Sequence, residues 1–182
     1  MKTRGKRRGG TFLFLMGLTL WLLASASACG YRVMGSEPVG EGQVRPTLAI
    51  PPFENRSMEA GLETLFANDM IQAFQDSKVV RVRSGDGTAD YMLRGSIKKL
   101  EHSSTAYLDI GQSLIRRVII TVEITLTDNR HQKVIWKDAE IVKADYVADA
   151  SYGIGEANRH QGIRQASVRL ARRVQDKVSI FF

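Results

Sequence analysis

A sustained alternation of apolar and polar residues over 116–127 is the clearest pattern in the chain. Successive side chains of a β-strand point to opposite faces, so this alternation predicts a strand with one buried face and one wet face. The apolar row comprises Val118, Ile120, Val122, Ile124 and Leu126. We expect this row to form a core with apolar residues of two predicted helices, namely Leu65, Phe66, Leu170 and Val174.

Four further segments show strand patterns, at residues 48–53, 79–83, 89–104 and 134–146. Turn-forming residues separate some of these strands, at 84–87 and 128–132. Residues 107–114 include Asp109 and Gly111 and are expected to form a long hairpin tip.

Two segments show the three- and four-residue apolar spacing of amphipathic helices. The first begins at about residue 58 or 62 and ends near residue 75, and Asn55 or Ser57 is expected to cap its N-terminus. The second covers about residues 156–179 and follows a predicted loop at 147–155.

This order of elements predicts an α+β fold, since two amphipathic helices can cover one face of one sheet. We expect a two-layer sandwich, in which both helices pack on the same face of a four- to five-stranded, mostly antiparallel sheet. The other face of the sheet is then exposed.

The first 28 residues show the layout of a secretory signal. Five Lys and Arg residues precede Cys29 without any acidic residue, the run 12–24 is apolar apart from Gly17 and Thr19, and small residues precede the cysteine. The apolar run is shorter than the roughly 20 residues of a membrane-spanning helix. We therefore expect residues 1–28 to be removed as a signal peptide.

Cys29, the only cysteine, allows two interpretations of the cleavage site. Residues 26–28 satisfy the small-x-small rule of ordinary signal cleavage, which would leave a free thiol. The alternative is a lipobox, in which Cys29 is acylated and becomes the first residue, with Ala26 where a lipobox usually has Leu. An unpaired thiol is unusual in an exported protein, so lipidation of Cys29 is favoured. Gly30 rather than Asp follows the cysteine, which favours the outer membrane.

The basic balance of the chain comes mostly from the signal. The full chain has 26 Lys and Arg against 19 Asp and Glu, and without residues 1–28 the balance is 21 to 19. A nucleic-acid-binding function inferred from the high pI is therefore excluded. Residues 29–46 are rich in Gly and Pro and are interpreted as a lipidated tether. Residues 47–182 then form a single domain of ordinary size.

No catalytic or metal-binding group of residues can be assembled from the sequence. His102, His131 and His160 lie far apart without metal-ligand neighbours, and each is interpreted as a solvated surface residue. No serine lies in a G-x-S-x-G frame. Gly153 and Gly155 begin like a phosphate-binding pattern that the sequence does not complete, so they are interpreted as loop glycines. We expect neither enzymatic activity nor a cofactor.

Basic residues on the exposed sheet face are the remaining candidates for a site. Arg94 and Lys98 lie on one predicted strand, and Arg117 with Thr121 lies on the next. Arg116 ends the predicted hairpin tip beside Arg117. Lys and Arg suit phosphate groups, such as those of a phosphorylated glycolipid of the outer membrane. We expect the four basic residues to contact a ligand or a partner protein. For any one of them, a merely solvated side chain is the alternative.

Three segments carry a resemblance to a known family: Cys29-Gly30-Tyr31-Arg32-Val33, the strand exit at 48–57 with its Pro-Pro-Phe-Glu-Asn-Arg-Ser sequence, and the strand at 89–97. Together they resemble the LptE family of lipopolysaccharide-assembly lipoproteins. The resemblance covers nearly all of the chain after the signal. It implies two helices on a mostly antiparallel sheet, as the patterns above predict, and a non-enzymatic role.

The resemblance also implies partners and a location. LptE proteins partly plug the lumen of LptD, an outer-membrane β-barrel, help it to assemble, and bind lipopolysaccharide for delivery to the outer leaflet. A lipid-anchored position on the periplasmic side of the outer membrane is implied. Residues 48–57 are also similar to the opening strand of lipoproteins that activate peptidoglycan synthases, and of the curli-secretion lipoprotein. An enzyme activator and a pore subunit therefore stay as alternatives.

Overall fold

The computed structural model describes residues 45–83, 88–108, 112–149 and 151–182. The predicted signal peptide, Cys29 and nearly all of the predicted tether lie outside these residues, as does the turn predicted at 84–87.

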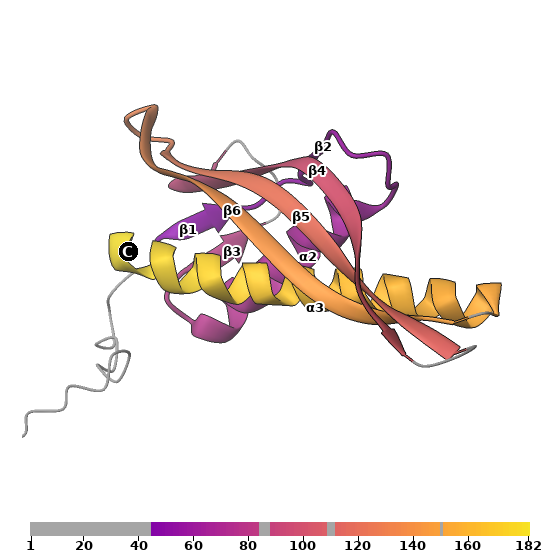
Figure 1. Ribbon diagram of the computed structural model, residues 1–182. Helices are drawn as coiled ribbons and strands as arrows, with labels where there is room; N and C mark the ends of the chain where they lie inside the picture. The colour runs from indigo at the N-terminus through magenta and orange to yellow at the C-terminus, as the bar shows by residue number, and fades with distance from the viewer. Residues whose placement is uncertain (1–44, 84–87, 109–111, 150) are drawn as a thin grey trace, which may run out of the picture. The chain divides into compact units, whose positions relative to one another are not determined.

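Six strands form one mixed sheet in the described part of the chain (Figure 1). Its three long strands pair in antiparallel order; they are β4 (Tyr91–Leu108), β5 (Gln112–Asp128) and β6 (Lys133–Ala148). Three short strands are parallel to their neighbours; they are β1 (Thr47–Ala49), β2 (Glu54–Asn55) and β3 (Arg81–Arg83). The order across the sheet is β3-β1-β4-β5-β6, and β2 pairs with β4.

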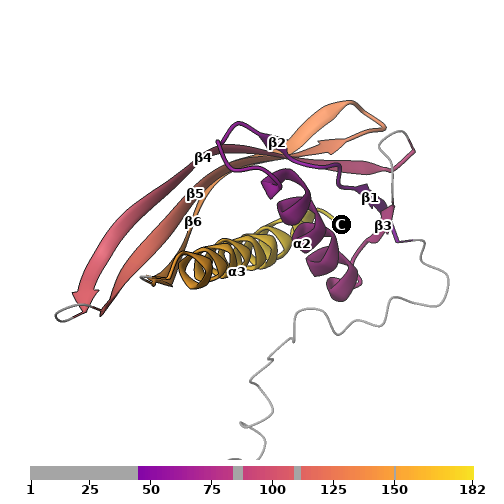
Figure 2. The same cartoon turned by 90° about the vertical axis from the view of Figure 1, so that its right-hand side faces the viewer.

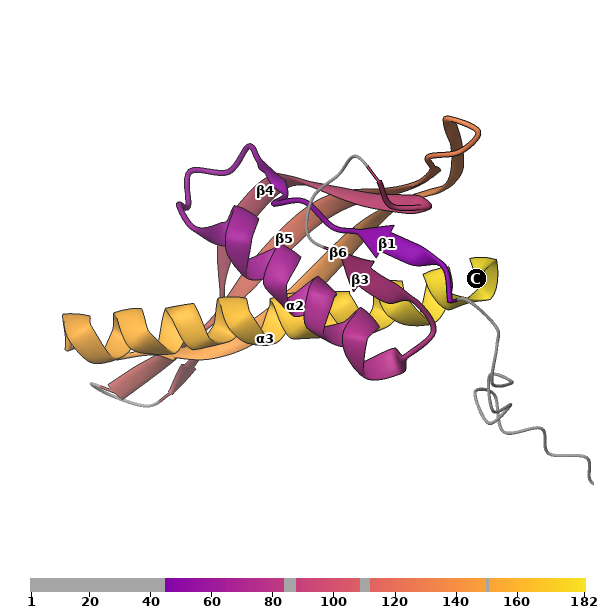
Figure 3. The ribbon, with the colours of Figure 1, turned by 180° about the vertical axis from the view of Figure 1, so that it is seen from behind.

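Two helices, α2 (Leu62–Ser77) and α3 (Tyr152–Val178), cover one face of this sheet, and the short 3-10 helix η2 (Ser179–Phe181) follows α3. Figure 2 shows the sheet arching over both helices, and Figure 3 shows α2 crossing α3. The predicted α+β class and its two layers are thus confirmed. The sheet has more strands than predicted, and its β1–β3 margin is parallel because α2 is a crossover that returns the chain in the same direction.

The apolar row of β5 lies at the centre of the core, as predicted. Each member is fully buried, and the row packs with residues of both helices in one cluster, including Phe66, Met70, Phe74, Leu170 and Val174. Leu65 is only half-buried and packs at the margin of the cluster. The alternation of β5 therefore identifies which face of the sheet the helices cover.

The first strand is shorter than the predicted 48–53, because Pro51 and Pro52 lack the N–H donors of a sheet ladder. Phe53 nevertheless reaches the core, where its ring centroid lies 6.3 Å from that of Phe66. It lies directly against β4, since a Cβ at Gly95 would be 2.2 Å from Cε2 of Phe53. Glycine is therefore required at position 95 by close packing.

The bounds of two predicted loops are wrong. The sequence predicts a hairpin tip at 107–114, but β4 continues to Leu108 and β5 begins at Gln112. It also predicts a loop at 147–155, but β6 continues to Ala148 and α3 begins at Tyr152. The antiparallel ladder continues outward, with Leu114 opposite Ala148, so the strands extend into both predicted loops. Asp109 and Gly111 lie outside the described residues. The two glycines interpreted as loop residues lie in the first turn of α3.

The predicted cap of α2 is also wrong. The residue at the N-cap is Gly61, whose φ of 85° suits glycine, and no side chain caps the helix. Asn55 instead holds the loop before the helix, because its Nδ2 donates to the Glu59 carbonyl oxygen (2.7 Å) and to Oε2 of Glu63 (2.9 Å).

Replacement of Val122 by Asp tests the assignment of the covered face. The buried carboxylate would have no partner, so we expect the free energy of unfolding to fall by about 4 kcal/mol or more. Thr121→Asp is the matched control, because Thr121 lies on the opposite face, and should cost about 1 kcal/mol or less. Urea denaturation measures both. Equal effects of the two substitutions would contradict the assignment.

Candidate functional site

The candidate site lies on the face of the sheet that the helices leave uncovered, which we call the open face. Odd-numbered residues of β5 from Arg117 to Thr127 lie on it, because the even-numbered residues are buried under the helices. The residues of β6 that pair with Arg117 to Thr125 are also odd-numbered, from Asp145 to Lys137, and a bulge in β6 then places Val134 opposite Thr127.

A β-bulge decides which residues of β4 share the open face. Ile97 pairs with Val122 and Lys99 pairs with Thr121, so Lys98 is the extra residue on β4. Before the bulge Arg94 and Ser96 lie on the open face, and after it Lys99 and Glu101 do. The register therefore places Arg94 on the open face, and the contact of Lys98 with Glu123 places Lys98 there.

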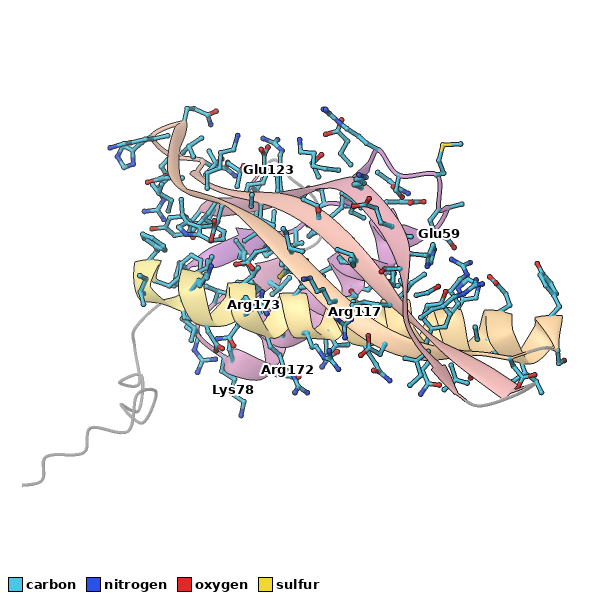
Figure 4. All side chains as sticks on the ribbon, viewed as in Figure 1. Glu59, Lys78, Arg117, Glu123, Arg172 and Arg173 are labelled. Atoms are coloured by element: carbon cyan, nitrogen blue, oxygen red, sulfur yellow. The ribbon has the colours of Figure 1, made fainter. Side chains whose placement is uncertain are left out.

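Two lysines contact one carboxylate of the open face, Glu123, which is labelled in Figure 4. Its Oε1 lies 3.5 Å from Nζ of Lys98 and 3.3 Å from Nζ of Lys137. A hydrogen bond from Lys137 is the main cause that lowers the pKa of Glu123. Arg94 lies opposite Thr125, whose other cross-strand neighbour is Lys137. We call Arg94, Lys98, Lys137 and Glu123 the Glu123 cluster; it has three cations and one anion.

Arg117 forms a separate ion pair on the same face. Its Nε and Nη2 donate to the two carboxylate oxygens of Asp145 at 2.6 Å and 2.9 Å. These hydrogen bonds lower the pKa of Asp145. Both side chains are more than a third exposed, so the pair contributes little to stability. Because Asp145 neutralises the charge of Arg117, Arg117 is a weaker candidate for binding an anionic ligand.

Arg116, predicted at the end of the hairpin tip, lies within β5 and not on the open face. Consecutive residues of a strand face opposite sides, so Arg116 shares the side of Val118 and pairs with Ser104 and Tyr146. The predicted patch is also divided along the strand, because Arg117 lies eight residues from Thr125, or about 27 Å. The structure thus brings Arg94 and Lys98 together, and leaves Arg116 and Arg117 apart from them.

An apolar strip lies between the two charged groups. Ile141 of β6 is 54% exposed, and its cross-strand neighbour is Thr121, beside the half-buried Ile119. Lys137 and Ile141 belong to the open face but were not predicted as site residues. The alternation of side chains along β6 indicates that both residues lie on the open face, once the register of β6 with β5 is known.

A second cluster of charges lies on the helix side of the sheet, around Arg159 of α3. Arg159 donates to Oε2 and Oε1 of Glu59 at 2.8 Å and 2.9 Å, and also to both carboxylate oxygens of Glu156. These contacts raise the pKa of the guanidinium and lower the pKa of both carboxyl groups. The loop before α2 is therefore held against α3.

The histidines are exposed, as predicted, but each has a partner. His102 lies on the helix side, where its Nδ1 is 3.3 Å from the Tyr146 hydroxyl and the two rings meet edge to face. Burial lowers the pKa of His102, and the charge of Arg159 lowers it further. His131 contacts Asp128, and His160 contacts Glu156.

A groove of about 450 Å³ between α2 and α3 is the other concave candidate. Its lining includes Asp69, Asp76, Arg172 and Asp176, and neither His nor Cys is among the lining residues. Among the described residues, no group of three or more His, Cys, Asp and Glu side chains is placed to hold a metal ion. Within the same part of the chain, no helix is long and apolar enough to cross a membrane.

The fold and the open face define an α+β protein with a one-sided sheet, whose candidate site is an exposed surface of charged and apolar side chains. The model of the LptE family, described as lipopolysaccharide-assembly, matches residues 45–178. The chain therefore belongs to the LptE family, a family of lipopolysaccharide-assembly proteins.

Solved structures with a similar fold share little sequence with this chain. A protein from Xanthomonas campestris is 14% identical, with a TM-score of 0.55 over 79% of this chain and 89% of its own. A hypothetical protein from Chlamydia trachomatis is 14% identical, with a TM-score of 0.52 over 75% and 96%. A minor lipoprotein from Acinetobacter baumannii is 16% identical, with a TM-score of 0.49 over 75% and 92%. No curated protein sequence matches the chain.

Replacement of Arg159 by Gln tests the charge cluster on the helix side. Glu59 and Glu156 would lose their shared partner, so we expect the free energy of unfolding at pH 7 to fall by about 2 kcal/mol. Arg164→Gln is the control, because Arg164 is exposed on the same helix. Urea denaturation should show a loss for the first variant and almost none for the second.

The same variant should change the pH dependence of stability. Arg159 lowers the pKa of both carboxyl groups below their ordinary value of 4.5, so its contribution is complete above that pH. The contribution is lost as the pH falls through the lowered native values. The difference between parent and Arg159→Gln should therefore shrink as the pH falls below 4.5. A difference that stays constant would contradict this account.

Proposed function

We propose that this chain is a lipid-anchored protein of the outer membrane that assembles with the barrel LptD and binds lipopolysaccharide. Membership of the LptE family is the observation that carries the proposal. In this proposal the chain has no catalytic activity, and it acts by occupying part of the barrel lumen and by presenting lipopolysaccharide to the barrel.

Cys29 is the proposed site of lipidation. The charged start, the apolar run and the small residues before the only cysteine support this assignment. Each buried methylene contributes about 0.8 kcal/mol, so more than one acyl chain would give a nearly permanent anchor. Mass spectrometry of the mature protein should find acyl groups on Cys29, whereas an unmodified thiol there would contradict the assignment.

The Glu123 cluster is the proposed contact for phosphate groups. Lys98 and Lys137 contact Glu123, and Arg94 lies opposite Thr125, two residues along β5, so the cluster keeps a positive excess after Glu123 is neutralised. Hydrogen bonds between Lys or Arg and phosphate are charge-assisted and stronger than neutral ones. The apolar strip at Ile119 and Ile141 lies beside the cluster and suits an acyl chain or an apolar wall of the barrel. Because the cations are exposed, salt should weaken the binding.

The two alternatives predict different partners. An activator of peptidoglycan synthases would be recovered with a synthase, and a curli-type lipoprotein would be recovered with further copies of itself in a pore. Affinity purification of the tagged chain from outer membranes separates the three functions. Recovery of a large outer-membrane barrel supports the proposal, and recovery of a synthase without a barrel would overturn it.

Neutralisation of the Glu123 cluster tests its role in the proposed function. We expect Arg94→Gln, Lys98→Gln and Lys137→Gln together to weaken lipopolysaccharide binding by about tenfold, which corresponds to about 1.4 kcal/mol. The salt dependence of the remaining binding should also be smaller. Binding to immobilised lipopolysaccharide at two salt concentrations measures both effects, after circular dichroism has confirmed folding.

The matched control replaces three exposed cations of the helix layer, Lys78, Arg164 and Arg172, by Gln. It removes the same charge from the other side of the molecule and should leave binding nearly unchanged. Equal losses in both variants would mean that net charge, rather than the cluster, carries the binding. Loss of the barrel together with lipopolysaccharide would assign the cluster to the protein interface.

A further inference from the structure

Strand β6 is an edge of the sheet, and it is 16 residues long. An edge strand presents unpaired backbone N–H and C=O groups and can pair with another strand. In an antiparallel sheet, alternate residues of the edge strand direct both backbone groups away from the sheet. On β6 these are the odd-numbered residues, because the carbonyl oxygens of Ile141, Lys143 and Val147 accept hydrogen bonds from side chains outside the sheet.

Helix α3 supplies all three of these donors. Asn158 Nδ2 lies 3.0 Å from the Val147 oxygen, Arg169 Nη1 lies 2.9 Å from the Lys143 oxygen, and Arg173 Nη1 lies 3.4 Å from the Ile141 oxygen. At Ala139 the outward N–H donates to Oδ1 of Asp138 at 2.9 Å, and Lys177 of α3 holds the other oxygen of Asp138 at 2.7 Å.

The spacing of these residues follows from the geometry of the two elements. Four helical residues advance about 6 Å, and two strand residues advance about 6.8 Å. Arg169, Arg173 and Lys177 are one helical turn apart and therefore reach successive sites along the β6 edge. Arg173 is fixed further by Oε2 of Glu140 at 2.9 Å.

We propose that α3 guards the β6 edge against pairing with a second copy of this chain. The side chains of Asn158, Arg169 and Arg173 occupy the outward carbonyl groups that a second β6 strand would need. The guard is a property of the fold and does not depend on the partner proposed above.

The sequence of β6 identifies a second copy as the strand that would pair there. Two antiparallel β6 strands related by a two-fold axis at Ile141 would be self-complementary. On the open face Lys137 would lie opposite Asp145, and Ala139 opposite Lys143. Ile141 would lie opposite its own copy as a hydrogen-bonded pair, because its backbone groups point outward. This register places opposite charges together and avoids like charges.

Removal of the guard should convert the edge into a dimer interface. The test combines Asn158→Ala with Arg169→Met, which removes the two shorter of the three guard contacts, at 3.0 Å and 2.9 Å. Arg173 stays in place, because it also neutralises the buried carboxylate of Glu140 and because its contact with the Ile141 oxygen, at 3.4 Å, is the longest of the three. We expect the association constant of the full lipidated chain in detergent to rise by about tenfold or more, since the competing hydrogen bonds of the monomer are lost. Sedimentation measures it. Arg164→Met with Arg172→Met is the control on the same helix and should not change it.

A cysteine at position 141 reports the register. The Cα atoms of a hydrogen-bonded antiparallel pair lie about 5.5 Å apart, which a disulfide can bridge. Ile141→Cys should therefore form a disulfide dimer in the guard-removed background and not in the parent. Lys143→Cys is the register control, because the two copies of residue 143 would be about 13 Å apart. The protein without an added cysteine shows how much disulfide dimer forms through Cys29, the only native cysteine.

The outcomes either support or overturn the guard. A folded, guard-removed protein that stays as monomeric as the parent would overturn it. Disulfide dimers of Ile141→Cys in the parent background, where the guard is intact, would also overturn it. Equal cross-linking at positions 141 and 143 would overturn the register. If circular dichroism shows that the double variant is unfolded, Arg169→Lys with Asn158→Gln replaces it. These two substitutions keep a donor group on each side chain but move it away from the carbonyl oxygen of β6. If α3 guards the edge, the association constant should still exceed that of the parent.

Discussion

Burial of one face of β5 under two helices is the constraint on which the rest of the structure depends. Five apolar side chains of this strand are fully buried, and strand alternation then commits the residues between them to the open face. The register of β4 and β6 with β5 then decides which of their residues lie under the helices and which lie on the open face. The charged and apolar surface of the open face is therefore a direct consequence of how the core is built.

Ion pairs fix α3 and the loop before α2 in the positions that this core requires. Glu140 is 5% exposed and faces α3, where Lys177 and Arg173 neutralise it. Arg159 holds Glu59 at the other end of the helix. Because unpaired charges at these partly buried sites would be costly, the pairs also select the position of α3 along β6. That position brings its donors to the free edge of the sheet.

The fold class and the covered face could be predicted from the sequence, because both depend on periodicity. The alternation of β5 and the apolar stripes of the helices specify two layers without knowledge of any contact. The ends of the elements could not be predicted, since pairing between Leu114 and Ala148 extends strands through residues with loop-like composition. Of the four predicted site residues, Arg94 and Lys98 share a surface, whereas Arg116 faces the other side. The bulge at Lys98 and the partner of Arg117 depend on cross-strand register, which no local pattern reports.

The central claim is that the open face, rather than the helix layer, is the surface on which this LptE-family protein meets its partners. A photo-reactive amino acid at Thr125, within the open face, and another at Arg164, on exposed α3, test it in intact outer membranes. The account predicts cross-links from position 125 to lipopolysaccharide or to a barrel protein, and few from position 164. Cross-links from position 164 alone would contradict it.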